Sequence, residues 1–211
     1  MRIFILSNFS YLLEILAALF AVVLYKKHQQ PFYKYFLGYL IVVIFIETLG
    51  VLCRIYKIPA TQAYNVYTFF EYNLVALLYF KLTKEKVSHR WIKYLMIAFN
   101  IVYFSSFIFI NLQSYTVLLG AIIVSLFMIF YFKELLKSDK IISFQKDLSF
   151  WITIGFLLYY LTTIPFYTVL YIIIIESKAE QQLLFNLQSV IVILTQLCFI
   201  SGLLWGTNRK N

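Results

Sequence analysis

The sequence predicts an all-α, single-domain integral membrane protein, a bundle of seven transmembrane helices with the N-terminus outside the cell and the C-terminus inside. The first observation is composition: of 211 residues, 63% are hydrophobic and 13% are charged. Soluble domains average about 45–50% apolar and about 25% charged residues. The excess is too large for a globular core and is typical of a polytopic membrane protein. The second observation is a series of apolar segments, and the third is the distribution of lysine and arginine.

Seven segments have the length that a membrane span needs, which is roughly 20 apolar residues at a rise of about 1.5 Å each. The sixth segment contains Pro165 and is long enough to tilt or to kink there. Every connection is short, so residues 1–211 form one domain whose activity lies within the bilayer or at its edges. The predicted spans are 4–25, 35–54, 62–81, 92–110, 115–134, 149–174 and 184–205.

Lysine and arginine concentrate in alternate connections. With the N-terminus outside, the inside segments hold 14 of the 18 basic residues and the outside segments hold 4. Cytoplasmic connections carry such an excess, so the sequence predicts an N-out, C-in protein of the cell (inner) membrane. The net charge of +9 then reflects topology and attraction to anionic inner-leaflet lipid. A nucleic-acid partner is not expected, because the basic residues are spread over loop ends instead of one folded face.

Three glutamates lie inside predicted spans, and all three fall in the outer half or at the midplane. Glu14 is about 15 Å from the outer surface, Glu47 about 10 Å and Glu71 about 13 Å, at 1.5 Å per residue. Intramembrane carboxylates are costly and usually functional. The coincidence of depth therefore favours one shared site over three separate contacts.

Polar neighbours share helical faces with these glutamates. Tyr64, Tyr67 and Thr68 lie on the Glu71 face of the third span, and Gln188 lies on a polar face of the seventh. Such faces should point inward, because an amide or a charge facing lipid costs a few kcal/mol. The sequence thus predicts an outward-facing polar pocket lined by spans one, two, three and seven. The alternative is that these groups only join helices, through hydrogen bonds that average under about 1 kcal/mol each.

Catalytic and metal-binding patterns are missing from the sequence. Both histidines, His28 and His89, fall at predicted cytoplasmic ends, so an intramembrane metal site is not expected. There is no H-E-x-x-H, no G-x-S-x-G and no glycine-rich phosphate loop. The sequence therefore predicts a protein that is not an enzyme and that holds no cofactor.

The preferred functional hypothesis is a receptor-like or sensor-like protein that acts through a membrane or cytoplasmic protein partner. The alternatives are a small proton- or cation-coupled transporter or channel that uses the same carboxylates, and a non-catalytic structural subunit of a membrane complex. Homo-oligomerisation is also possible. The candidate partner-docking residues are basic and lie on the predicted inner loops: Lys84, Lys86, Arg90, Lys137 and Lys140.

Asn65, Tyr67 and Glu71 form an N-x-Y-x-x-x-E pattern that is followed by an aromatic and leucine-rich half-span. This pattern resembles the "NIYSLVEF"-type third span of a group of small seven-helix membrane proteins from Bacteroidota. Phe69 and Phe70 depart from it, since the group has aliphatic residues there. The group's span layout is similar to that of membrane sensor modules of bacterial histidine kinases. The resemblance therefore implies a sensory role or a partner role.

Overall fold

The structure is a computed structural model that describes residues 2–108, 113–138, 144–171 and 177–206. Within these ranges the chain forms seven α-helices and no strand, so the all-α prediction is confirmed. The helices are α1 (Arg2–Val23), α2 (Tyr33–Ile55), α3 (Thr61–Leu82), α4 (Lys86–Ser106), α5 (Gln113–Leu136), α6 (Leu148–Tyr171) and α7 (Lys178–Trp205).

Two helices begin earlier than their predicted spans. The sequence predicts starts at 92 and 184, whereas α4 begins at Lys86 and α7 at Lys178. Backbone hydrogen bonding continues through polar residues, so a helix extends beyond the apolar length that defines a span. The predicted ends at 110 and 174 lie outside the described residues.

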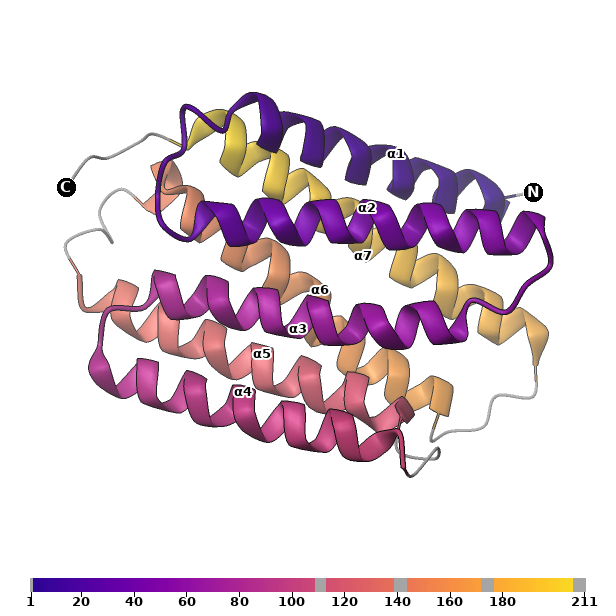
Figure 1. Cartoon of the computed structure of the whole chain (residues 1–211). Helices are drawn as coiled ribbons and strands as arrows, with labels where there is room; N and C mark the ends of the chain where they lie inside the picture. The colour runs from indigo at the N-terminus through magenta and orange to yellow at the C-terminus, as the bar shows by residue number, and fades with distance from the viewer. Residues whose placement is uncertain (1, 109–112, 139–143, 172–176, 207–211) are drawn as a thin grey trace.

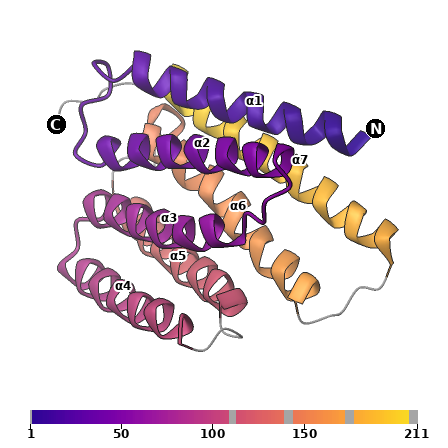
Figure 2. The same cartoon turned by 45° about the vertical axis from the view of Figure 1, so that its right-hand side comes forward.

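Successive helices run antiparallel, and the start of α1 and the end of α7 lie at opposite ends of the bundle (Figure 1). Each helix packs against the next in the chain, and α7 packs against α1, so that the seven helices close into a ring. An additional contact joins α3 and α5 across this ring. Figure 2 shows α4 at the edge of the bundle, beside α3 and α5.

Aromatic rings fill the centre of the ring of helices. Phe199 of α7 meets Phe36 of α2 and Phe156 of α6 edge to face, each with centroids 5.1 Å apart. Tyr39 of α2 meets Phe156 in the same way at 4.9 Å. Edge-to-face pairs contribute about 0.5–1.5 kcal/mol beyond their buried area. Gly155 makes room for this layer, because the Phe199 ring occupies the space of a Cβ there.

The small residues of α1 lie inside the bundle. Ala17 and Ala21 are fully buried, and Ala18 is nearly so. Small side chains let helix backbones approach closely, which is how helices pack without a hydrophobic driving force from water.

The outer surface carries large apolar side chains on every helix. Examples are Leu16 on α1, Phe45 on α2 and Ile101 on α4, each at least one third exposed. Four helices are long and apolar enough to cross a membrane, namely α2, α6 and the greater parts of α5 and α7. In α3 and α4 the apolar run is diluted, by Glu71 in one and by an initial basic turn in the other.

One end of the bundle carries the connections from α1 to α2 and from α3 to α4, and we call it the basic end. Here Lys27 donates from Nζ to the carbonyls of Leu203 and Leu204, at 3.2 and 2.8 Å. His28 donates from Nε2 to the Leu203 carbonyl at 2.9 Å. These bonds cap the C-terminus of α7, where carbonyls lack intrahelical partners and cations are favoured.

Candidate functional site

A polar cluster occupies the interior between α1, α2, α3 and α6. We call it the glutamate cluster. It comprises Glu14 of α1, Tyr39 and Glu47 of α2, Tyr67 and Glu71 of α3, and Tyr160 of α6.

Glu71 is held by tyrosine hydroxyls. Its side chain is 5% exposed, and its Oε1 accepts a hydrogen bond from the Tyr160 hydroxyl at 2.9 Å. Tyr67, one helical turn earlier, also hydrogen bonds to Glu71 and to Tyr39 of α2. Burial of a carboxyl group is costly without such partners. Glu71 is therefore fixed in place by α3 and α6 together.

Glu47 lies between the other two carboxylates. It is near enough to both Glu14 and Glu71 for their charges to interact. The three glutamates, predicted from separate helices, thus share one region. Arg54, exposed near the end of α2, also interacts electrostatically with Glu47. The cluster therefore extends from the centre of the bundle toward the end opposite to the basic end.

Glu14 has a carboxylate oxygen without a hydrogen-bond partner in the part of the chain that the structure describes. The side chain is 8% exposed, and its Oε2 is buried with no hydrogen-bond partner among the described residues. It faces the cluster, because its charge interacts with Glu47 and with Tyr39. A buried acceptor without a partner costs about 1–3 kcal/mol, and more if charged. The group that would satisfy this oxygen is not supplied by the described part of the protein.

The remaining predicted pocket residues divide into two kinds. Tyr64 is 37% exposed, packs its hydroxyl against Gly50, and interacts electrostatically with Glu47 and Arg54. It belongs to the open side of the cluster. Thr68 is buried, but its hydroxyl donates to the Tyr64 carbonyl at 2.9 Å, so its proton stays within its own helix.

Gln188 is half-buried on α7, a helix that supplies no member of the glutamate cluster as defined above. The helix that contributes instead is α6, through Tyr160. Sequence reasoning missed Tyr160 and Tyr39. Both are tyrosines in apolar runs, and with 18 tyrosines in the chain nothing in the pattern separates them from interface or core tyrosines.

The side chains of the cluster are carboxylates, hydroxyls and aromatic rings. In the described part of the chain, no three His, Cys, Asp or Glu side chains lie close enough together to hold a metal ion. The cluster offers instead spaced carboxylates, tyrosine hydroxyls and aromatic faces. Ammonium groups bind to carboxylates and to aromatic faces.

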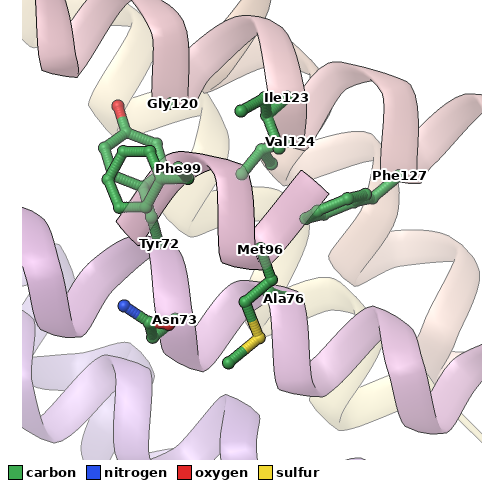
Figure 3. A pocket seen from close by; sticks show the side chains of 9 residues that line it. All are labelled: Tyr72, Asn73, Ala76, Met96, Phe99, Gly120, Ile123, Val124 and Phe127. Carbon is green, nitrogen blue, oxygen red and sulfur yellow. The ribbon is translucent and has the colours of Figure 1, made fainter. Parts of the chain in front are cut away.

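A second polar group lies between α3 and α4, and it is complete. Asn73 and Asn100 exchange hydrogen bonds through their amides, at 3.0 and 2.9 Å. Each amide nitrogen also donates to a carbonyl of its own helix, at Phe69 and Met96. Asn73 borders a void of about 10 Å³ whose other lining side chains are mostly apolar (Figure 3). This space is about that of one water molecule.

The candidate docking residues lie at the basic end. Lys84, Lys86 and Arg90 are exposed. Lys137 is exposed too and pairs with Glu85 at 3.0 Å. Lys140 lies outside the described residues.

Next to that ion pair, Glu134 of α5 holds the start of α4. Its carboxylate accepts from the backbone N–H groups of Lys84 and Glu85, at 2.6 and 3.3 Å. Both N–H groups precede Lys86, the first residue of α4, so the bonds fix the connection that leads into this helix. The connection between α3 and α4 is thereby tied to α5.

Comparisons with protein-family models, with curated proteins and with solved structures give no match. Any functional conclusion therefore rests on the geometry of the glutamate cluster and on the surface around it.

Proposed function

We propose that the chain is a multi-pass protein of the cell (inner) membrane that crosses the bilayer seven times, with its basic end in the cytoplasm. The large apolar side chains exposed on every helix support this, because soluble monomers rarely expose contiguous apolar patches beyond a few hundred Å². Polar side chains of the helices, such as Glu71 and Thr153, are buried in the interior, as expected for a bundle in lipid. The excess of lysine and arginine at the basic end supports the orientation.

Within this frame the protein is a receptor-like or sensor-like protein for a small cationic ligand, which enters from the outer side. The observation that carries the proposal is the convergence of Glu14, Glu47 and Glu71 on one region, with one oxygen of Glu14 lacking a partner. The resemblance to small seven-helix proteins of Bacteroidota implies the same kind of role and stays a hypothesis.

The conformational change caused by the ligand would reach a partner protein at the basic end. There the tie between Glu134 and the start of α4 makes the connection between α3 and α4 a defined surface. Exposed Lys84, Lys86 and Arg90 give this surface a positive charge that suits an acidic partner protein. Movement of α3, which carries Glu71, would be transmitted directly to this connection.

The proposal is tested by thermal unfolding of the purified protein in detergent with added cations. The probes are ammonium, methylammonium and tetramethylammonium, with sodium and potassium beside them. A cation at 100 times its Kd stabilises the protein by about 2.7 kcal/mol, which raises Tm by about 5–10 °C for a chain of this size. Glu14→Gln and Glu47→Gln should remove the shift.

Glu180→Gln is the matched control, because Glu180 is an exposed glutamate in the first turn of α7. It should keep the full shift. If no cation stabilises the wild type more than it stabilises Glu14→Gln, the ligand-binding proposal is wrong.

A proton- or cation-coupled transporter is the second candidate. It is favoured by one observation, namely that buried hydroxyls continue beyond Glu71 toward the basic end, at Tyr79, Thr153 and Tyr131.

A further inference from the structure

Four aromatic rings form a column inside the bundle, between the glutamate cluster and the basic end. Tyr160 of α6 lies 5.9 Å from Phe156 of the same helix, centroid to centroid. Phe156 lies 6.4 Å from Tyr79 of α3, and Tyr79 lies 6.4 Å from Tyr131 of α5. All four side chains are at most 6% exposed. The column therefore runs through the interior, shielded from lipid.

Both ends of the column are joined to carboxylates by hydrogen bonds. At one end Tyr160 donates to Glu71 at 2.9 Å. At the other, the Tyr131 hydroxyl bonds to the Ser149 hydroxyl at 2.8 Å, and Ser149 donates to Asp147 at 2.7 Å. Asp147 is partly exposed and immediately precedes α6, at the basic end.

The middle of the column has a hydroxyl at Tyr79 and none at Phe156. The Tyr79 hydroxyl is buried near the Thr153 hydroxyl, but it has no hydrogen-bond partner among the described residues. Thr153 in turn donates to the Ser149 carbonyl at 2.7 Å. Three of the four rings thus carry a hydroxyl, a group that can accept one proton and release another. Phe156 cannot do so.

We propose that this column is a proton path between the glutamate cluster and the cytoplasmic face, closed in this structure at Phe156 and at the Tyr79 hydroxyl, which has no hydrogen-bond partner among the described residues. A proton held on Glu71 would pass to Asp147 by successive transfers between hydroxyls. Each hydroxyl accepts one proton and releases one, so its own number of protons does not change. The path opens when the Phe156 ring turns aside and water enters its place. The protein could then carry out proton-driven transport in addition to ligand sensing.

The glutamate cluster contacts Phe156, the residue that closes the path, through Tyr39. The Phe156 ring is packed by Tyr39 at 4.9 Å and by Phe199 at 5.1 Å. Tyr39 also hydrogen bonds to Tyr67, which bonds to Glu71. A cation that binds among the glutamates would shift Tyr39 and with it the ring. This coupling rests on the proposed function, whereas the path itself requires only Glu71.

The test is proton flux into proteoliposomes that contain a pH-sensitive dye, driven by a potassium diffusion potential set with valinomycin. Phe156→Ala opens the gap and should raise the flux several-fold above that of wild type. Adding Glu71→Gln or Tyr131→Phe to Phe156→Ala should return the flux to the wild-type level, because each removes one proton-carrying group of the path.

Phe156→Ala with Tyr72→Phe is the matched control. Tyr72 is a buried tyrosine of the same helix as Tyr79, but its hydroxyl donates to the Val117 carbonyl, outside the path. This double variant should keep the raised flux. A Phe156→Ala protein that purifies as a folded species with wild-type flux overturns the proposal, and so does a raised flux that survives Glu71→Gln.

Phe156→Tyr and Phe156→Val cover the case in which Phe156→Ala does not fold. The first supplies the missing hydroxyl and the second a smaller gap, and at least one should raise the flux in a way that Tyr131→Phe abolishes. Wild-type flux in both overturns the path. Cation-induced stabilisation is measured without any flux, so failure of the path and failure of the ligand site are distinguishable.

Discussion

Two buried polar groups of the bundle differ in whether all their polar atoms have hydrogen-bond partners. The Asn73–Asn100 pair uses both amides reciprocally, and each nitrogen reaches a backbone carbonyl as well. Glu14, at similar burial to its neighbours in the core, leaves one carboxylate oxygen without a partner in the described structure. We call the asparagine pair closed, because its amides bond to each other and to the backbone. We call the glutamate cluster open, because one oxygen of Glu14 lacks a partner within the described ranges.

The difference shows how helix-joining contacts and sites can be separated inside a membrane bundle. A closed polar group contributes to packing and has no capacity for a further partner. An open one carries a desolvation cost that a ligand, a proton or an ion can offset. Depth in the bundle does not make this distinction, since both groups lie near the middle of their helices.

The largest stability effect should come from breaking the closed pair. Asn73→Leu leaves the Asn100 amide half-satisfied and should lower the free energy of unfolding by about 1–2 kcal/mol. The double variant Asn73→Leu/Asn100→Leu removes both amides and should lie closer to wild type than the single variant. Unfolding in detergent by denaturant titration measures both. Additive losses would show that the amides do not form a unit.

A smaller effect, of opposite sign, is expected at the open group. Glu14→Met removes the unsatisfied oxygen and should leave the stability of the ligand-free protein unchanged or raise it by up to about 1 kcal/mol. The same titration measures it, with Glu180→Met as the exposed control. A loss as large as that of Asn73→Leu would mean that Glu14 is a helix-joining contact.

His28 is an intermediate case, with one ring nitrogen bonded to the Leu203 carbonyl and Nδ1 buried without a partner in the described ranges. Burial lowers the pKa of His28 from its usual 6.5, and the Lys27 ammonium lowers it further against the effect of the Leu203 bond. The unfolded chain therefore binds the proton more readily than the folded chain, and stability falls as the pH drops below about 6.5.

The measurement is Tm in detergent as a function of pH between about 8 and 5.5, a range that spans the ordinary pKa of histidine. His28→Gln should flatten the acid side of the curve. His89, which bonds to the Thr83 carbonyl, remains in this variant and serves as the internal control. Identical curves for the two proteins would place the acid sensitivity elsewhere.

The smallest effect is expected at the exposed ion pair between Lys137 and Glu85, whose side chains are 58% and 37% exposed. Lys137→Ala should cost less than about 0.5 kcal/mol, because solvent screens such pairs. Its effect on a partner that docks at the basic end should be larger than its effect on stability. Pull-down of the same partner with wild type and variant compares the two. Equal recovery would remove Lys137 from the docking surface.

Much of the fold could be predicted from the sequence, because apolar length and short connections define seven helices with little freedom. The starts of α4 and α7 could not, since backbone hydrogen bonding continues into the polar residues that follow Lys86 and Lys178. The closed ring, with α7 against α1, also has no signal in a single sequence.

Depth in the sequence predicts the glutamates as a set, and electrostatic interactions through Glu47 link the three of them. Their partners could not be predicted. The Tyr160 bond to Glu71 spans 89 residues and depends on how α6 is rotated in the bundle, which tyrosine content does not reveal. Gln188 was predicted from a helical face of α7 and stays a prediction, whereas the hydrogen bond to Glu71 comes from Tyr160 of α6. Such packing choices arise from the shapes of rings such as Phe156 and Phe199.

Calorimetric titration with the cation that stabilises the protein most, for wild type, Glu14→Gln and Asn73→Leu side by side, tests the central claim most directly. Glu14→Gln should lose heat of binding while it keeps wild-type stability. Asn73→Leu should keep binding while it loses stability. The account is contradicted if Glu14→Gln binds the cation as wild type does, or if it loses stability to the same extent as Asn73→Leu.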